Sequence, residues 1–168
     1  MFIDSHCHLD RLKLDPENDS LDKVVKRAED SLVSGMLCVS VTLKDFPSMV
    51  EKTQKYNNVW LSCGAHPLNQ EDKVDEEELL RLSQHERVIA VGETGLDYHY
   101  APETKELQLD SFKKHIGVAR ELNKPLIIHT RDAQLDTLDM LTNEKAHEVG
   151  GILHCFTETW EMAEAAMD

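Results

Sequence analysis

Five residues of the chain have side chains suited to binding a metal ion, and each lies at the end of a short apolar run. They are His6, His8, Glu93, His129 and His154. Side chains two residues apart in a β-strand project to the same face, so the first two histidines can hold one ion together. A solvent-facing histidine pair in a loop explains that spacing equally well on its own. Four apolar runs that all end in a ligand-type residue favour a single metal site at one end of one sheet.

The chemistry of these side chains favours two metal ions over one. Imidazoles suit zinc, nickel or manganese better than magnesium alone, and a carboxylate can bridge two ions. Five protein ligands are too many for one catalytic zinc that keeps an open position. We therefore predict two divalent ions (Zn, Mg, Mn or Ni) and hydrolytic chemistry. For Glu93 the simpler alternative is a strand-end carboxylate in water, but an unpaired carboxylate beside a buried strand would be costly.

The apolar runs alternate with segments of helical periodicity. After a first strand that opens the chain, strands are expected over residues 36–41, 59–63, 88–92, 126–129 and 152–155. Helices are expected to begin near residues 20, 45, 75, 102 and 132, and Gly35 is the expected stop signal of the first. Strands that are apolar throughout and alternate with amphipathic helices indicate a parallel sheet covered by helices.

Two parallel-sheet architectures compete for this pattern. A doubly wound sheet would carry a glycine-rich phosphate turn after an early strand, and the sequence has none. A TIM-type (β/α)8 barrel places functional residues at the C-terminal ends of several strands, as here. Such barrels have eight strands and about 250 residues, whereas this chain has 168 residues and six expected strands. We predict an α/β fold, with one domain over residues 1–168 that supplies the first six strand–helix units of a barrel truncated at its C-terminus.

The charge of the chain limits the partners that it can bind. A formal net charge of −14 repels polyanions, and no basic patch typical of a nucleic-acid binding module is present. A phosphate substrate must therefore be attracted locally, by bound cations and a few well-placed donors. The charge does not exclude an enzyme that grips one or two phosphates.

The remaining composition indicates a cytoplasmic protein without a membrane segment. No apolar run approaches the roughly 20 residues that cross a bilayer, and no signal peptide is recognisable. The four cysteines, Cys7, Cys38, Cys63 and Cys155, lie in or beside strand-like runs. We expect them to be buried reduced thiols, because disulfides are rare in the cytoplasm.

Five short motifs follow one another along the chain. They are Ile3-Asp4-Ser5-His6-Cys7-His8, Gly64-Ala65-His66-Pro67, Gly92-Glu93-Thr94-Gly95-Leu96-Asp97-Tyr98, Ile128-His129-Thr130-Arg131 and His154-Cys155-Phe156-Thr157. Together they resemble the TatD-related deoxyribonucleases, a family of the metal-dependent amidohydrolase superfamily. Each motif alone is weak, but the five follow the family's order over essentially the whole chain. The resemblance implies a metal-dependent hydrolase of DNA phosphodiester bonds.

Carried over by position, the resemblance also implies roles for the five ligand-type residues. His6 and His8 would hold the first metal, Glu93 would bridge the two ions as the catalytic carboxylate, and His129 and His154 would hold the second. The family uses a further aspartate near the end of the eighth strand, which lies beyond the six expected strands. A second departure is Glu158, where family members often have a small residue; its carboxylate could weaken phosphate binding or face away.

Substrate contacts are expected from two other residues. Arg131 lies two residues after His129 on the same side of the strand and could clamp a phosphate with two nitrogens of its guanidinium. An ordinary salt bridge is the alternative. His66 follows the third strand and could contact substrate, or hydrogen-bond within its own turn. Three other histidines, at positions 85, 115 and 147, are expected on the surface.

Three functions remain open from the sequence. The first is a two-metal nuclease that binds its DNA substrate locally at the metal site, with a monomer as the expected state. The second is a small-molecule amidohydrolase or phosphoesterase of the same superfamily, many of which bridge their metals with a modified lysine where this chain has Glu93. The third is a catalytically incomplete chain that binds metal without turnover.

Overall fold

A computed structural model of the chain describes residues 1–69 and 73–167. Six strands form one sheet in the order β1-β2-β3-β4-β5-β6, and every neighbouring pair is parallel. The strands are β1 Phe2–Cys7, β2 Val33–Cys38, β3 Val59–Cys63, β4 Val88–Asp97, β5 Leu126–Arg131 and β6 Gly151–Leu153. Because the order in the sheet is the order in the chain, each connection steps to the next strand, as in a barrel.

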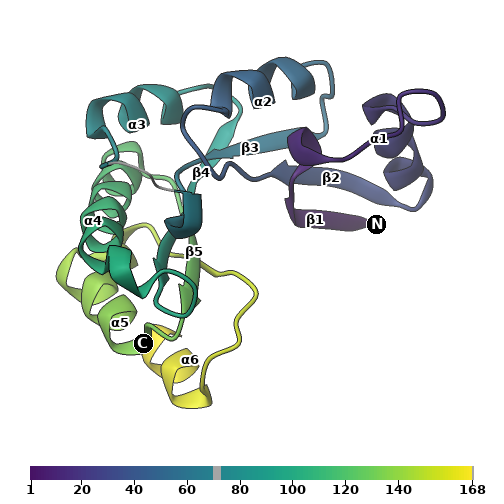
Figure 1. The fold of residues 1–168 in the computed structure, drawn as a ribbon. Helices are drawn as coiled ribbons and strands as arrows, with labels where there is room; N and C mark the ends of the chain where they lie inside the picture. Colours follow the sequence, from purple (N-terminus) through teal and green to yellow (C-terminus); the bar gives the residue numbers. More distant parts are fainter. Residues whose placement is uncertain (70–72, 168) are drawn as a thin grey trace.

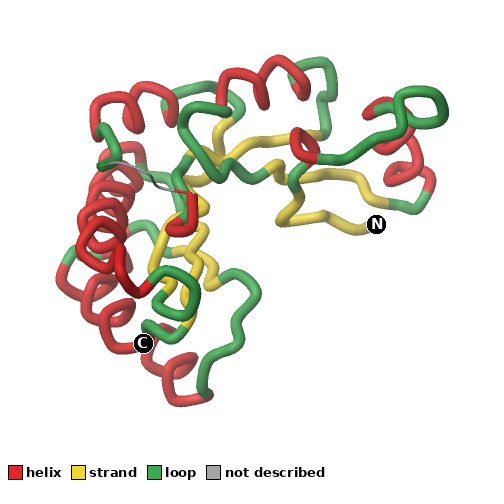
Figure 2. Tube along the Cα trace, in the orientation of Figure 1, coloured by secondary structure: helices red, strands yellow, loops and turns green. Residues whose placement is uncertain are grey.

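A helix lies between each strand and the next. The helices are α1 Leu21–Asp30, α2 Phe46–Thr53, α3 Glu76–Ser83, α4 Lys105–Leu122, α5 Gln134–Asn143 and α6 Trp160–Met167, with short 3-10 turns η1 Leu9–Arg11, η2 Pro67–Asn69, η3 Pro102–Thr104 and η4 Ala146–Glu148. The sheet curls, and α2 to α5 follow its outer side (Figure 1). Figure 2 shows the strands as one continuous curve with the helices outside it. The predicted α/β fold with six strand–helix units of a barrel is confirmed.

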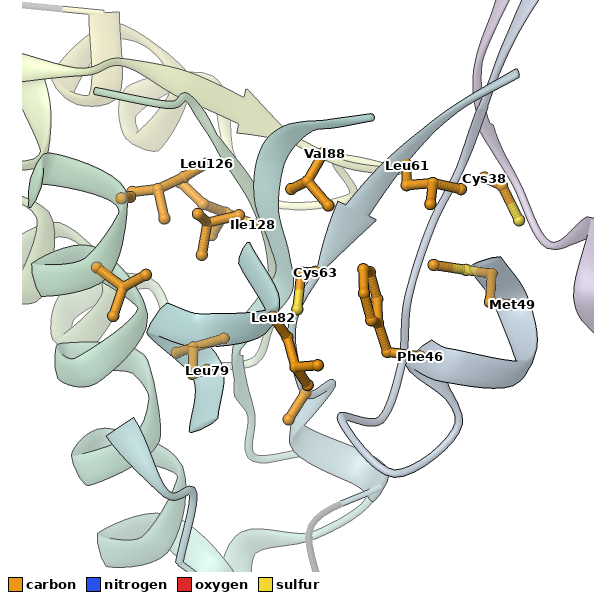
Figure 3. Packing of buried hydrophobic residues seen from close by; sticks show 14 of the residues in the cluster. Cys38, Phe46, Met49, Leu61, Cys63, Leu79, Leu82, Val88, Leu126 and Ile128 are labelled. Atoms are coloured by element: carbon orange, nitrogen blue, oxygen red, sulfur yellow. The ribbon is translucent and has the colours of Figure 1, made fainter. Parts of the chain in front are cut away.

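The core lies between the sheet and these outer helices. Phe46 and Met49 of α2 and Leu79 of α3 are almost fully buried, and they face Leu61 and Val88 of the sheet (Figure 3). Removing a buried side chain of this size typically costs about 2–5 kcal/mol. This packing holds the strands in place, and the C-terminal halves of the strands, with the residues that directly follow them, carry the candidate site.

The first helix ends earlier than the sequence predicts. Ser20 caps it by accepting a hydrogen bond from the backbone of Lys23, as expected, but the helix stops at Asp30 and Leu32 makes the turn with a φ of 67°. Gly35 lies inside β2 instead. A Cβ at Gly35 would approach the Trp60 ring to 2.8 Å, so the close packing of β2 on β3 is what requires glycine.

The fourth strand continues well beyond its predicted end at residue 92. It runs through the Gly92–Asp97 motif to pair with β5 as far as Arg131. Gly95 has a φ of +131°, and a Cβ there would lie 2.0 Å from the backbone oxygen of His129. The glycine therefore lets β4 approach β5 closely enough to keep pairing past Glu93.

Two smaller expectations about burial are wrong. All four cysteines lie in the described part of the chain and are free thiols, but Cys155 is exposed because β6 ends at Leu153 and the chain turns outward. His115, expected on the surface, is fully buried on the inner face of α4. None of the helices described is long and apolar enough to cross a membrane.

Candidate metal centre

Glu93 lies at the centre of the candidate site. It sits within β4, only 4% exposed, and its two carboxylate oxygens face different histidines. Oε2 is 3.2 Å from Nε2 of His6, whereas Oε1 is 3.6 Å from Nε2 of His66 and 3.6 Å from Nδ1 of His129. One carboxylate thus lies between two sets of imidazoles.

Within residues 1–69 and 73–167, two groups of three side chains bring their ligand atoms within 4.8 Å of one another. The first group is His6, His8 and Glu93, and the second is His66, Glu93 and His129. Both groups share the carboxylate. His154 completes neither group; its ring stacks on that of His6, with 3.4 Å between the ring centroids and 9° between the planes.

The end of β1 presents the first group. His6 is in the strand and His8 follows it, so both point to the same side, as predicted. Nδ1 of His8 lies 2.9 Å from the carbonyl oxygen of Val39. A carbonyl only accepts, so Nδ1 carries the proton and Nε2 keeps its lone pair for a ligand. Nδ1 of His6 is buried without a hydrogen-bond partner among the described residues.

The second group contains two histidines with opposite tautomers. Nε2 of His129 lies 2.9 Å from Oδ2 of Asp97, so Nε2–H donates to the carboxylate and Nδ1 is free to bind. His66 instead accepts a hydrogen bond at Nδ1 from the backbone of Leu68, 3.1 Å away. The proton of a neutral His66 therefore sits on Nε2, the atom that faces Glu93. His129 is arranged as a ligand and His66 as a hydrogen-bond donor.

The charges of the site follow from burial and from these contacts. Burial alone would raise the pKa of Glu93, but the neighbouring imidazoles of His129, His6 and His66 outweigh it and hold the pKa well below its ordinary value. Burial alone would lower the pKa of His129, and the carboxylates of Glu93 and Asp97 outweigh it and raise the pKa. Burial lowers the pKa of His66 to about 4, so this ring is neutral near pH 7.

The donor set fits divalent metal ions. It offers imidazole nitrogens and one carboxylate with two separate oxygens, and this mixture suits zinc and related ions. The buried Nδ1 of His6 without a partner is costly unless a further group satisfies it. In His8 and in His129, one ring nitrogen donates to an acceptor and the other keeps its lone pair. Metal-binding histidines are usually oriented in this way.

The loop after β4 carries three neighbouring aromatic residues, Tyr98, His99 and Tyr100. Tyr98 is packed down by a 2.6 Å hydrogen bond from its hydroxyl to Asp136. Tyr100 is 63% exposed, and the guanidinium of Arg131 lies 5.2 Å from the centre of its ring. The guanidinium of Arg131 therefore lies over an aromatic ring of this loop.

Glu158 does not point toward the histidine groups. Its carboxylate accepts hydrogen bonds from the backbone of Asp132 at 3.0 Å and from the amide of Gln134 at 2.7 Å. These two bonds tie the segment after β6 to the segment after β5. Of the two alternatives from the sequence, the structure favours the one in which Glu158 faces away.

Sequence reasoning missed two buried groups behind the site. Asp97 holds His129, although the sequence analysis gave this residue of the Gly92–Tyr98 motif no role. His115 of α4 donates from Nδ1 to the backbone oxygen of Ser111, 2.7 Å away, and accepts at Nε2 from the backbone of Ala65, 3.0 Å away. It thereby fixes the turn that carries His66. A polar residue at the end of a buried strand was the available signal for Asp97. For His115 the signal was its helical spacing from Phe112 and Ala119, which places it on the buried face of α4.

The model of one protein family, described as "TatD related DNase", matches residues 3–168. The chain belongs to the TatD-related DNase family. This finding agrees with the resemblance that the five motifs indicate.

Two relatives from bacteria show how far the likeness extends. The chain is 49% identical over 166 residues to the uncharacterized metal-dependent hydrolase YcfH of Escherichia coli K12, and the match covers 99% of this chain and 63% of YcfH. It is 33% identical over 148 residues to the 3'-5' ssDNA/RNA exonuclease TatD of Shigella flexneri serotype 5b, covering 87% of this chain and 57% of that protein. The chain thus spans less than two thirds of the length of either relative.

A crystal structure supports the fold of this TatD-related chain. YjjV, a TatD homologue from Escherichia coli K12, superimposes with a TM-score of 0.83 at 24% identity, over 99% of this chain and 64% of YjjV. At this identity the likeness shows the fold alone. The six strands described here are therefore the strands of a TatD-type barrel.

Proposed function

We propose that this chain forms the metal-binding part of a metal-dependent hydrolase, and that its substrate is DNA. The observation that carries the proposal is the position of Glu93, one buried carboxylate whose two oxygens face two separate groups of histidines. A bridging carboxylate between two imidazole sets is typical of two-metal hydrolytic sites. The family and its relative YcfH, named a metal-dependent hydrolase, support the hydrolase.

In the proposal His6 and His8 hold the first ion, His129 and His154 hold the second, and Glu93 bridges them. The ions would supply positive charge that activates water for attack and stabilises the charge developing on a phosphate. The chain's own residues set the donors. His8 and His129 each present one unprotonated nitrogen, because the other nitrogen of each ring donates a hydrogen bond, to Val39 and to Asp97 respectively.

His66 and Arg131 are proposed to bind the scissile phosphate. Neutral His66 has its Nε2–H at the centre of the site, where it can donate to a phosphate oxygen. Arg131, two residues after His129, provides a charged fork that matches the geometry of a phosphate. These local donors matter because the net charge of −14 would otherwise repel a nucleic acid.

The choice of DNA as substrate rests on the family and on one relative. The family model carries the description DNase, and the Shigella flexneri relative is named a 3'-5' ssDNA/RNA exonuclease. The structure supports the proposal with the N–H of His66, a hydrogen-bond donor that a phosphate oxygen could accept. The cytoplasmic location and monomeric state stay predictions from the sequence.

The test is hydrolysis of an end-labelled single-stranded DNA oligonucleotide. Reactions contain zinc, magnesium, manganese or nickel, or a chelator, and compare the unsubstituted chain with Glu93→Gln. Glu51→Gln, on the exposed side of α2, is the matched control. We expect metal-dependent cleavage that the control keeps and Glu93→Gln loses. Cleavage that survives in Glu93→Gln contradicts the role of the carboxylate, and absence of cleavage with every metal contradicts the nuclease.

A further inference from the structure

A buried carboxylate lies directly behind the site, on the far side of His129 from Glu93. Asp97 is the last residue of β4 and is fully buried. Its Oδ2 is 2.9 Å from Nε2 of His129, whereas Nδ1 of the same ring lies 3.6 Å from Glu93. The imidazole of His129 is thus held between two carboxylates, one on each ring nitrogen.

The orientation of this carboxylate is over-determined. The second oxygen, Oδ1, accepts hydrogen bonds from the backbone of His99 at 3.1 Å and of Tyr100 at 2.8 Å. These two bonds leave Oδ2 as the oxygen that faces His129. The carboxylate therefore cannot turn without losing its two hydrogen bonds to the backbone of the loop that follows β4.

The backbone of Asp97 is held as well, by a fully buried glutamine on α4. Oε1 of Gln108 accepts from the Asp97 amide at 2.7 Å, and Nε2 of Gln108 donates to the Asp97 carbonyl at 3.1 Å. Nε2 of Gln108 also contacts the carbonyl of Ala101 and the hydroxyl of Thr104, each at 2.8 Å. Gln108 thereby joins α4, the loop and the end of β4.

We propose that Asp97, held by Gln108, is a positioning residue that keeps the proton of His129 on Nε2 and presents Nδ1 to the metal site. An ionised carboxylate only accepts hydrogen bonds, so it selects this tautomer. His66 has the opposite arrangement, because its Nδ1 accepts from Leu68 and its proton therefore faces Glu93. The groups that hydrogen-bond to each ring thus decide which of these two neighbouring histidines binds metal and which donates a hydrogen bond.

This inference rests on the proposed function only in placing an ion at His129. The first test is zinc binding by equilibrium dialysis to the unsubstituted chain and to Asp97→Asn. If the asparagine oxygen keeps the two backbone donors, its NH2 group faces Nε2 and moves the proton of His129 to Nδ1, which blocks the ligand atom. We expect the second zinc to bind roughly 10- to 100-fold more weakly, and the zinc at His6 and His8 to bind unchanged.

The chain offers a matched control for this substitution. Asp132, directly after β5, makes a 2.9 Å contact with Nδ1 of His99, in the loop after β4. This is the same kind of carboxylate–histidine pair, but both side chains are exposed. Asp132→Asn should leave both zinc affinities unchanged. Equal zinc affinities in Asp97→Asn and the unsubstituted chain, with both folded by circular dichroism, would overturn the proposal.

A second measurement does not depend on the folding of any variant. The ¹⁵N chemical shifts of the His129 ring, recorded on the unsubstituted chain at alkaline pH, report which nitrogen carries the proton. We expect the proton on Nε2, and a proton on Nδ1 overturns the inference. If the unsubstituted chain binds fewer than two zinc ions, the proposed second metal fails, while the tautomer still decides the role of Asp97.

Discussion

The imidazole of His154 lies flat on that of His6, with their centroids 3.4 Å apart. These residues belong to the two opposite ends of the sheet, one in β1 and the other directly after β6. In a flat sheet, strands five places apart would be about 24 Å from each other at the ordinary spacing of about 4.8 Å. The stack therefore shows that the sheet curls far enough to bring the ends of its first and last strands into contact.

This contact makes the ligand role of His154 testable. Replacing His154 with alanine should weaken the second metal ion at least about tenfold, because it removes a proposed nitrogen ligand. Zinc affinity measured by dialysis is the readout. His147→Ala, which removes an exposed histidine of η4, is the control and should change nothing. Two zinc ions bound with unchanged affinity would show that His154 only stacks on His6.

His66 should affect turnover without affecting metal content. Its protonated Nε2 makes it a hydrogen-bond donor in the proposed site, and such a bond to a charged group is worth about 1.5–3 kcal/mol. His66→Ala should therefore lower kcat/KM about 10- to 100-fold, while the zinc stoichiometry stays unchanged. His66→Gln, which keeps an N–H donor, should recover part of the rate. Loss of a zinc ion in His66→Ala would instead make this residue a ligand.

The buried His115 should make stability depend on pH. Burial lowers its pKa to about 4, so the unfolded chain takes up the proton first as the pH falls below about 6.5. The free energy of unfolding should be fully retained above that value and fall by about 2 kcal/mol between about pH 7 and pH 5. Urea unfolding at the two pH values measures the change.

His115→Gln provides the comparison for that measurement. The variant should be less stable near neutral pH, because it disturbs the bond to Ala65, but its decline toward acid pH should be smaller by the His115 contribution. An identical decline in both proteins would show that other groups cause it.

Gly95 should tolerate no side chain. A Cβ at this position meets the backbone oxygen of His129 at 2.0 Å, and its φ of +131° is unfavourable for other residues. Gly95→Ala should lower the free energy of unfolding by several kcal/mol and weaken zinc binding, since the strand that carries His129 must move. Chemical unfolding and dialysis check both effects.

Gly117 provides the opposite case on α4. There a Cβ would find only the Glu76 carboxylate at 3.8 Å, so Gly117→Ala should raise stability by up to about 1 kcal/mol. Destabilisation by both substitutions to the same extent would contradict the account of Gly95.

Much of this molecule follows from local patterns in the sequence. The alternation of apolar runs with helical segments predicts the parallel sheet covered by helices. This prediction needs only the short-range periodicity of each segment and the burial of both sheet faces. The same alternation predicts His6, His8, Glu93, His129 and His154 at strand ends, although the strands that contain Glu93 and His129 run on beyond them. Their gathering at one end of the sheet follows from parallel strands, whose C-terminal ends lie together.

The boundaries that the sequence misplaces are those that depend on partners distant in the chain. Gly35 looks like a helix stop, yet it lies in β2, where the ring of Trp60 leaves no room for a Cβ. The strand at Glu93 continues to Asp97 because β5 pairs with it. Local patterns contain no information on such neighbours.

The chemical role of each histidine is also decided by the tertiary structure. His66 follows β3 and His129 lies within β5, and a backbone amide holds the first ring whereas the Asp97 carboxylate holds the second. Their opposite tautomers come from these partners. The residue types alone determined that this chain has a site with metal-binding chemistry; the folded arrangement of acceptors and donors behind each ring decided which nitrogen is available, because a proton on an imidazole goes to whichever nitrogen faces an acceptor.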